Sequence, residues 1–281
     1  MKLRGLRRSR NIEDRRRSGG GGVRGAGIGG AGLLIVLAIG YFTGIDVTPL
    51  LNGIEGQQVQ SAPRALSAAE QRAADFSARV LGSTEEVWGD ILPAQADMAY
   101  TPPVLVLFSG VTRSPCGNAS GATGPFYCPA DRKAYLDTEF FATLAQQLGA
   151  RGDFAAAYVI AHEVAHHIQN ELGILNAVHE ARQASSDAGA NALTVRLELQ
   201  ADCLSGVWAS AVNDLLEPGD IEEALNAARR IGDDHLQRQA GRVPQPHTFT
   251  HGTSEQRARW FARGYDSGQM GACDTFSADR L

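Results

Sequence analysis

The apolar residues of this chain recur every three to four positions over most of its length, which predicts a largely helical protein. The run Val104–Phe108 is apolar at every position and follows a Pro-Pro pair that stops a helix, so it predicts a buried strand. Helices are expected at about 67–81, 84–91, 138–148, 154–172, 191–212, 220–230 and 254–264, and short strands around 126–128 and 134–136. The pattern indicates the α+β class, helix-rich with a small β-sheet.

Polar residues and glycines mark the ends of these helices. Ser67 followed by Glu70 is a capping box, and Asp153 caps the start of the helix that ends before Gly173. Asp137 or Thr138 is expected to cap the helix that runs to Leu148.

A different pattern precedes the folded part. Residues 25–45 are 21 positions without a charge, and about 20 apolar residues cross a bilayer as a helix. Residues 1–24 hold nine Lys or Arg and two Asp or Glu, a net +7, whereas the other 257 residues sum to −12. Basic flanks stay cytoplasmic. We therefore expect a single-pass inner-membrane protein with a basic cytoplasmic N-terminus (1–24), a transmembrane helix (25–45), a linker (46–66) and a periplasmic or otherwise extracytoplasmic domain (67–281).

Other interpretations of residues 25–45 stay open. A signal peptide is one, although the basic region is long and no clear small-x-small cleavage site follows the apolar run. A flexible leader is another, because the first third of the segment is Gly-rich. The acidic body excludes wide contact with nucleic acid, which needs a basic face.

The four cysteines agree with export, since an even count in an exported domain indicates two disulfides. Three pairings are possible. We expect Cys116–Cys128, which closes a short loop, together with Cys203–Cys273. No C-x-x-C pair is present, which disfavours a zinc site built from these cysteines.

The stretch Ala161–His167 contains H-E-x-x-H inside a helical segment. His162 and His166 are four residues apart, so they lie one above the other on one helix face and can share a Zn²⁺ ion. Glu163 lies beside them, where it can take a proton from a zinc-activated water. The alternative is a surface helix with two satisfied histidines. It is disfavoured because the neighbouring residues are apolar and buried bare histidines would be costly.

A catalytic zinc site needs a third protein ligand and keeps one position open. The apolar segment around 196–207 offers Glu198 and Asp202, again four residues apart on one face. We expect Glu198 to complete a His₂Glu site for one Zn²⁺ per chain. Asp202 would accept the remaining N–H of a ligand histidine and fix its tautomer. An exposed acidic pair is the alternative, against which the flanking apolar residues argue.

These motifs resemble known zinc peptidases. H-E-x-x-H followed by E-x-x-A-D is similar to the gluzincin pattern and to the membrane-bound CAAX-type proteases. Over almost the whole chain, the sequence resembles more closely the bacterial membrane family described as putative neutral zinc metallopeptidases. That likeness rests on Cys116-Gly117, Gly124–Pro129, Ala161–Asn170, Leu197–Cys203, Leu216–Ala224 and Phe249–Phe261. The resemblance implies a zinc-dependent peptidase with a gluzincin-like core and leaves the substrate open.

The segment Thr250–Arg257 resembles a Thr-His segment with a downstream Arg in the CAAX-type proteases, with Gly252 where those usually have Pro. By that resemblance His251, or alternatively Arg257, would hold the developing oxyanion. The other interpretation is that His251 only precedes the last helix and packs there. His167 points about 100° away from the metal ligands by helix geometry and is expected to face solvent.

The predicted function is a membrane-anchored zinc peptidase with Glu163 as general base, acting on a peptide or protein. One alternative is a non-enzymatic exported module held together by zinc. It is disfavoured because structural zinc usually has four protein ligands. A zinc hydrolase of a non-peptide amide is the other alternative, and the ligands do not distinguish it. The oligomeric state is not written in the sequence.

Overall fold

The computed structural model describes residues 1–17, 65–120 and 124–281, which form a helix-rich α+β structure with a small mixed sheet. The four-stranded sheet has the order β1 (Ile12–Asp14), β2 (Val104–Phe108), β6 (Lys133–Asp137), β5 (Phe126–Cys128). The first three strands are parallel, and β5 pairs antiparallel with β6 at the edge. The predicted α+β class and the three predicted strands are confirmed.

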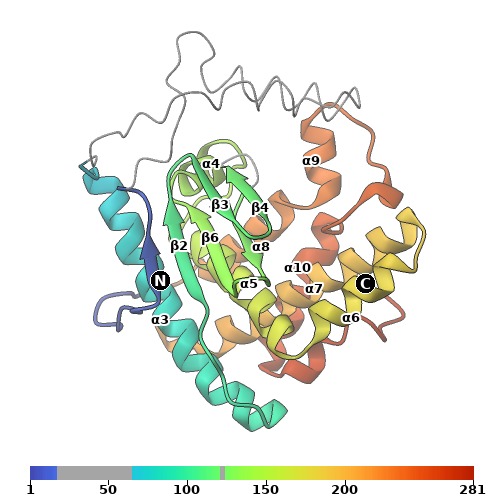
Figure 1. The fold of residues 1–281 in the computed structure, drawn as a ribbon, viewed down its shortest axis with the longest axis horizontal. Helices are drawn as coiled ribbons and strands as arrows, with labels where there is room; N and C mark the ends of the chain where they lie inside the picture. The colour runs from blue at the N-terminus through green and yellow to red at the C-terminus, as the bar shows by residue number, and fades with distance from the viewer. Residues whose placement is uncertain (18–64, 121–123) are drawn as a thin grey trace.

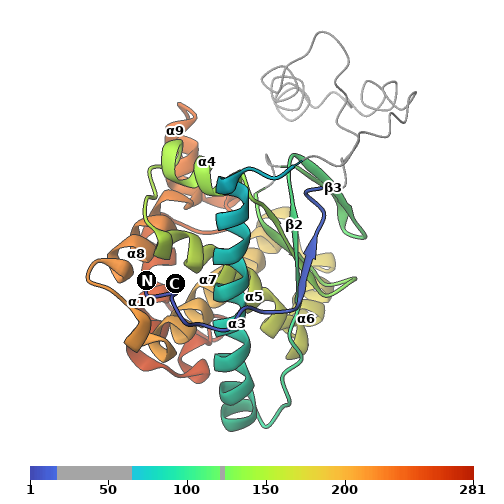
Figure 2. The ribbon, with the colours of Figure 1, turned by 90° about the vertical axis from the view of Figure 1, so that its left-hand side faces the viewer.

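One helix lies between the sheet and two of the other helices. It is α5 (Asp153–Glu171), which contacts β5 and β6 on one side and α7 and α8 on the other (Figures 1 and 2). Because both sides are covered, α5 is apolar and buried almost all round, the pattern of a core helix. The remaining helices are α3 (Ala68–Ala96), α4 (Phe140–Gln146), α6 (Ile174–Gln183), α7 (Asp187–Ala211), α8 (Asp220–Arg230), α9 (Asp233–Gln239) and α10 (Ser254–Ser267).

The first long helix differs from the prediction of two shorter ones. The capping box of Ser67 and Glu70 is present, but α3 then continues for 29 residues through Gly82 and past Pro93. Buried Trp88 and Leu92 anchor its second half in the core. Tertiary packing therefore stabilises the helix at Gly82 and Pro93, which have low helix propensity.

Several short elements escaped the sequence pattern. A hairpin of β3 (Val111–Ser114) and β4 (Gly117–Ser120) starts before Cys116 and runs into the loop that Cys116–Cys128 closes. Neither this hairpin nor α6 nor α9 was predicted. The predicted cap of α4 at Asp137 or Thr138 is wrong, because Asp137 still belongs to β6 and its carboxylate accepts the N–H of Glu139 before the helix starts.

Both predicted disulfides, Cys116–Cys128 and Cys203–Cys273, are present. The first joins the segment between β3 and β4 to strand β5, and the second ties α7 to the 3₁₀ turn Met270–Cys273. The three tryptophans, Trp88, Trp208 and Trp260, are buried in the core.

Residues 1–17, which the sequence pattern assigned to a separate basic segment, lie against the body (Figure 2). We call them the N-terminal arm. Strand β1 of the arm extends the sheet beside β2. The predicted transmembrane helix, 25–45, and nearly all of the predicted linker, 46–66, lie outside the described residues. Within the described residues, no helix combines the length and apolar composition needed to cross a bilayer.

Candidate metal centre and its cleft

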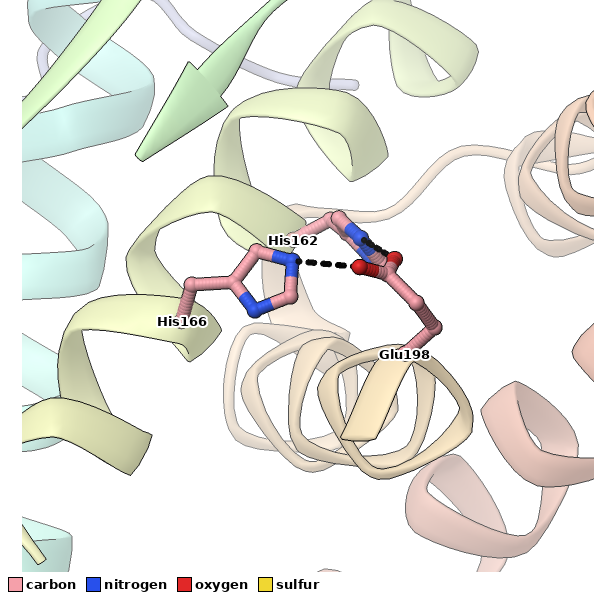
Figure 3. A group of neighbouring side chains, drawn as sticks. All are labelled: His162, His166 and Glu198. Carbon is pink, nitrogen blue, oxygen red and sulfur yellow. Dashed lines mark hydrogen bonds and ion pairs between the residues drawn. The ribbon is translucent and has the colours of Figure 1, made fainter. Parts of the chain in front are cut away.

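Three side chains from two helices converge on one point. His162 and His166 project from α5, and Glu198 projects from α7, which packs against it (Figure 3). The His162 Nε2 atom lies 3.1 Å from one carboxylate oxygen of Glu198, and the His166 Nε2 atom lies 3.5 Å from the other. One ligand atom from each residue falls within 4.8 Å of the others. This is the arrangement predicted for the metal ligands.

Glu163 lies beside this group with 8% of its surface exposed. Burial raises the pKa of its carboxyl, and the neighbouring His166 and His162 partly offset that rise. Its Oε2 atom is buried and has no hydrogen-bond partner within the described protein. A buried carboxylate oxygen without a partner is costly. The donor set and this orphaned oxygen therefore fit a catalytic metal with a water beside it.

The His162 ring is held from behind by a charged cluster. Its Nδ1 atom lies 2.9 Å from Oδ1 of Asp202, although not at a hydrogen-bonding angle. Asp202 is completely buried and accepts two hydrogen bonds from Arg257, each 2.9 Å long, and one of 2.5 Å from the Tyr158 hydroxyl. Asp202 thus lies behind His162, where the sequence placed it, and no hydrogen bond joins the two side chains in this geometry.

The His166 ring is held instead by neutral amides. Its Nδ1 atom lies 2.8 Å from Oε1 of Gln169, while the Gln169 amide donates to the Leu197 carbonyl and to Oε1 of Gln200. With Nδ1 turned toward each partner, both histidines present Nε2 to the metal position. The sequence pattern predicted no role at the metal centre for Gln169, Gln200 or Tyr158. The signal for Gln169 was its place three residues after His166, on the same helix face.

The charged neighbours of these groups set their titration. Burial alone would lower the pKa of His162, but Asp202 and Glu198 outweigh it and raise that pKa to about 10. Burial alone would raise the pKa of Glu198, but His166 and His162 hold it well below its ordinary value. The buried histidines and the Glu198 carboxylate therefore stabilise each other's charged forms.

The metal centre opens into a cleft of about 1110 Å³. Edge strand β5 contributes Phe126 and Tyr127 to its wall, and the lining is mostly apolar, with Phe140, Leu175 and Val178 among the contributors. A cleft of this size has room for several residues of an extended peptide.

His251 lies at the cleft, as its predicted role requires, with its side chain 48% exposed. Its Nδ1 atom lies 3.3 Å from Oδ1 of Asp233. Oδ2 of Asp233 accepts the backbone N–H groups of Thr250, His251 and Gly252, so this carboxylate fixes the whole loop. Arg257, the other candidate for the oxyanion, is instead committed to Asp202 and only 2% exposed.

The prediction that His167 faces solvent is wrong. The side chain is fully buried, with Nε2 2.6 Å from the Thr101 carbonyl oxygen and Nδ1 3.0 Å from the Tyr127 hydroxyl. The helix face that turns away from the metal meets strand β5 rather than water. His167 thus joins the ligand helix α5 to the edge strand that borders the cleft.

Comparison with known proteins identifies a family for the chain. A family model described as "Putative neutral zinc metallopeptidase" matches residues 1–276. The chain is 47% identical to the protein YpfJ of Escherichia coli K12, covering 98% of this chain and 99% of that protein. It is 44% identical to Rv2575 of Mycobacterium tuberculosis over 71% of this chain and 69% of that protein. Both relatives are named as uncharacterized, and no solved structure matches the chain.

Proposed function

The chain belongs to the family of putative neutral zinc metallopeptidases, and from that premise we propose that it is a zinc-dependent peptidase that hydrolyses peptide bonds. One observation carries the proposal. His162, His166 and Glu198 converge on a single point, and the orphaned carboxylate oxygen of Glu163 lies beside them, at the floor of an open cleft.

The three converging residues would hold one Zn²⁺ and leave a position free for water, as in catalytic rather than structural zinc sites. A zinc ion bound there would lower the pKa of a bound water to about 7 and polarise the scissile carbonyl. Glu163 would accept a proton from the attacking water and pass it to the leaving amine. Burial supports this role, because it brings the pKa of the Glu163 carboxyl up toward the working range of a base that must also act as an acid.

We propose that the substrate is an extended peptide lying beside β5. This strand is at the edge of the sheet and lines the cleft, so its free side can pair with an added strand. His251 would donate to the developing oxyanion, a contribution typically worth about 10²–10³ in rate. Its support is its place at the cleft and the fixed loop around Asp233.

The two other functions are less well supported. A non-enzymatic module closed by zinc gives no reason for the unpartnered Glu163 oxygen or for the open cleft. A hydrolase of small non-peptide amides would need no cleft of this volume. Cleavage of a mixed peptide library separates that function from a peptidase.

The two disulfides support an oxidising, extracytoplasmic location for the domain. Anchoring to the inner membrane through residues 25–45 stays a prediction, since these residues lie outside the described part of the chain.

The decisive experiment uses the oxidised full chain, with zinc measured per molecule and cleavage of a peptide library measured with and without a chelator. We expect one zinc per chain and chelator-sensitive cleavage. Glu163→Gln should keep the zinc and lose about 10²–10⁴-fold in cleavage rate. His162→Ala and Glu198→Ala should lose zinc. Unchanged cleavage in Glu163→Gln, or normal zinc binding in Glu198→Ala, would contradict the proposed roles.

A further inference from the structure

The N-terminal arm is built into the body by backbone pairing. In β1, Ile12, Glu13 and Asp14 pair in register with Leu105, Val106 and Leu107 of β2. The N–H of Leu105 donates to the Asn11 carbonyl and the N–H of Arg15 donates to the Leu107 carbonyl, both at 2.8 Å. The edge of β2 is thus covered by the arm and by no other strand of the described structure.

A buried carboxylate of the body depends on the arm. The side chain of Glu85, on α3, is 6% exposed and accepts hydrogen bonds from Arg7, Ser9 and Asn11. All of these donors belong to the arm. The arm therefore covers this carboxylate and also supplies the hydrogen bonds that a buried charge requires.

Helix α3 also has a surface shaped for the arm. A Cβ atom on Gly82 would lie 2.4 Å from the Arg7 carbonyl oxygen, so only glycine permits this approach of the two backbones. The N–H of Ser9 donates to the Ala78 carbonyl at 2.8 Å one turn earlier. Gly89 on the same helix has nothing within 4 Å of such a Cβ atom and is not part of this contact.

The charges of the arm are used within the protein. The Arg16 side chain is 2% exposed, pairs with Asp14 and donates to the Glu70 carbonyl. The Lys133 ammonium of β6 lies 2.6 Å from the Glu13 carboxylate, and Arg15 reaches the Arg113 carbonyl at 2.9 Å. Arg7 of the arm pairs with Glu85 and Arg8 pairs with Asp75, both on α3, so part of the arm's positive charge is balanced by acidic residues of the body.

This docking conflicts with a single bilayer crossing between arm and body. A membrane-spanning helix separates its two ends by the roughly 30 Å of the hydrocarbon core, and loops do not carry strand pairing across it. We propose that residues 1–17 are a permanent part of the domain, so that the arm and residues 65–281 occupy the same compartment. The proposal contradicts the predicted topology, in which the arginines of the arm lie on the opposite side of a membrane from the domain. The inference is independent of peptidase activity.

The test is the accessibility of one introduced cysteine in each part of the full chain. Arg10→Cys lies in the arm and Val243→Cys in the body, and both wild-type side chains are exposed, Val243 to 81%. Cells expressing each variant are treated with a membrane-impermeant maleimide, before and after permeabilisation. We expect the two variants to react alike. Reaction of the Val243→Cys variant in intact cells, with reaction of the Arg10→Cys variant only after permeabilisation, would overturn the proposal.

A pair of glycine variants tests the docking itself in purified full-length protein. Gly82→Ala should lower the melting temperature by several degrees and speed tryptic cleavage at the arm's arginines at least several-fold. Gly89→Ala is the matched control on the same helix and should do neither. Equal melting temperatures and equal cleavage of the arm in the two variants would show that the arm does not dock on α3. If Gly82→Ala does not accumulate, the cysteine pair still decides the question.

Discussion

The two histidines of the metal centre are held by opposite kinds of support. Behind His162 stands a buried ionised cluster, in which Asp202 is clamped by Arg257 and Tyr158. Behind His166 stands a neutral amide, Gln169. Both supports turn Nε2 of their ring toward the same point. A partner at Nδ1 is therefore enough to orient each ring. The negative charge of Asp202 behind His162 has a further effect.

The further effect of the Asp202 charge is electrostatic. A carboxylate behind an imidazole raises its basicity and its strength as a metal ligand, and a neutral amide does so less. A second buried carboxylate behind His166 would join Glu163, Glu198 and Asp202 in one small volume, and close like charges resist ionisation together. The amide orients His166 without adding to this repulsion.

The largest effect is expected from Asp202→Asn, which keeps the shape of the charged support and removes its charge. Arg257 would stay buried without a carboxylate, at a cost of about 3–5 kcal/mol in the free energy of unfolding. Zinc affinity should fall about 10–100-fold. Urea unfolding and zinc titration measure the two quantities. A loss below about 1 kcal/mol, the scale of an exposed ion pair, would mean that the cluster is not a tight buried one.

A smaller effect is expected from Gln169→Leu, which removes the neutral support. The Leu197 carbonyl and the His166 ring would each lose a partner, at a cost of about 1–3 kcal/mol in unfolding free energy. Zinc affinity should fall about tenfold. Gln169→Glu is the matched variant, since it restores an acceptor for His166 but adds the charge that the amide avoids. If Gln169→Glu binds zinc better than the wild type, like-charge repulsion is not what selects the amide.

The pH dependence of the zinc-free protein should also distinguish the two sides. The pKa of His162 is raised to about 10 in the folded state, against about 6.5 in an unfolded chain. Because its pKa is raised in the folded state, protonated His162 stabilises the folded protein fully below about pH 6.5. That stabilisation is lost as the pH rises toward 10. Wild-type protein without zinc should therefore lose stability over this range in urea unfolding. Asp202→Asn should lose less, because a main cause of the shift is gone.

The smallest effect is expected at an exposed pair of the same residue types. Gln183 and His179 on α6 lie 2.8 Å apart through their side chains but are exposed to solvent. Gln183→Ala should change the unfolding free energy by about 0.5 kcal/mol or less and leave zinc affinity unaltered. A change as large as that of Gln169→Leu would mean that burial is not what gives the Gln169 contact its weight.

The parts of this site that could be predicted from sequence are those with a fixed helical spacing. His162, His166, Glu198 and Asp202 each follow a four-residue repeat on an apolar helix, so chain geometry alone brought each pair to one face. Gln169 obeys the same geometry, but an amide next to a metal motif has no chemistry of its own to single it out. The burial of His167 was not predicted because helix spacing gives the direction of a side chain but not the element that packs against it.

The fold shows the same division. The capping box at Ser67 is a local signal and was found, whereas the continuity of α3 through Gly82 depends on the arm and the core. The arginines of the arm could be interpreted from sequence only by the rule for membrane flanks. Arg15 and Arg16 pair with the nearby Glu13 and Asp14, but Arg7 pairs with Glu85, 78 residues further along the chain, and no local pattern predicts such a long-range pair.

The disulfide Cys203–Cys273 has a practical consequence for anyone producing this protein. Cys203 follows Asp202 directly, and the Cys273 carbonyl accepts a hydrogen bond from Gln200, which in turn accepts from Gln169. One covalent link therefore borders the supports of both histidines. Protein produced in a reducing cytosol would lack this disulfide. We expect it to bind zinc more weakly than the oxidised protein.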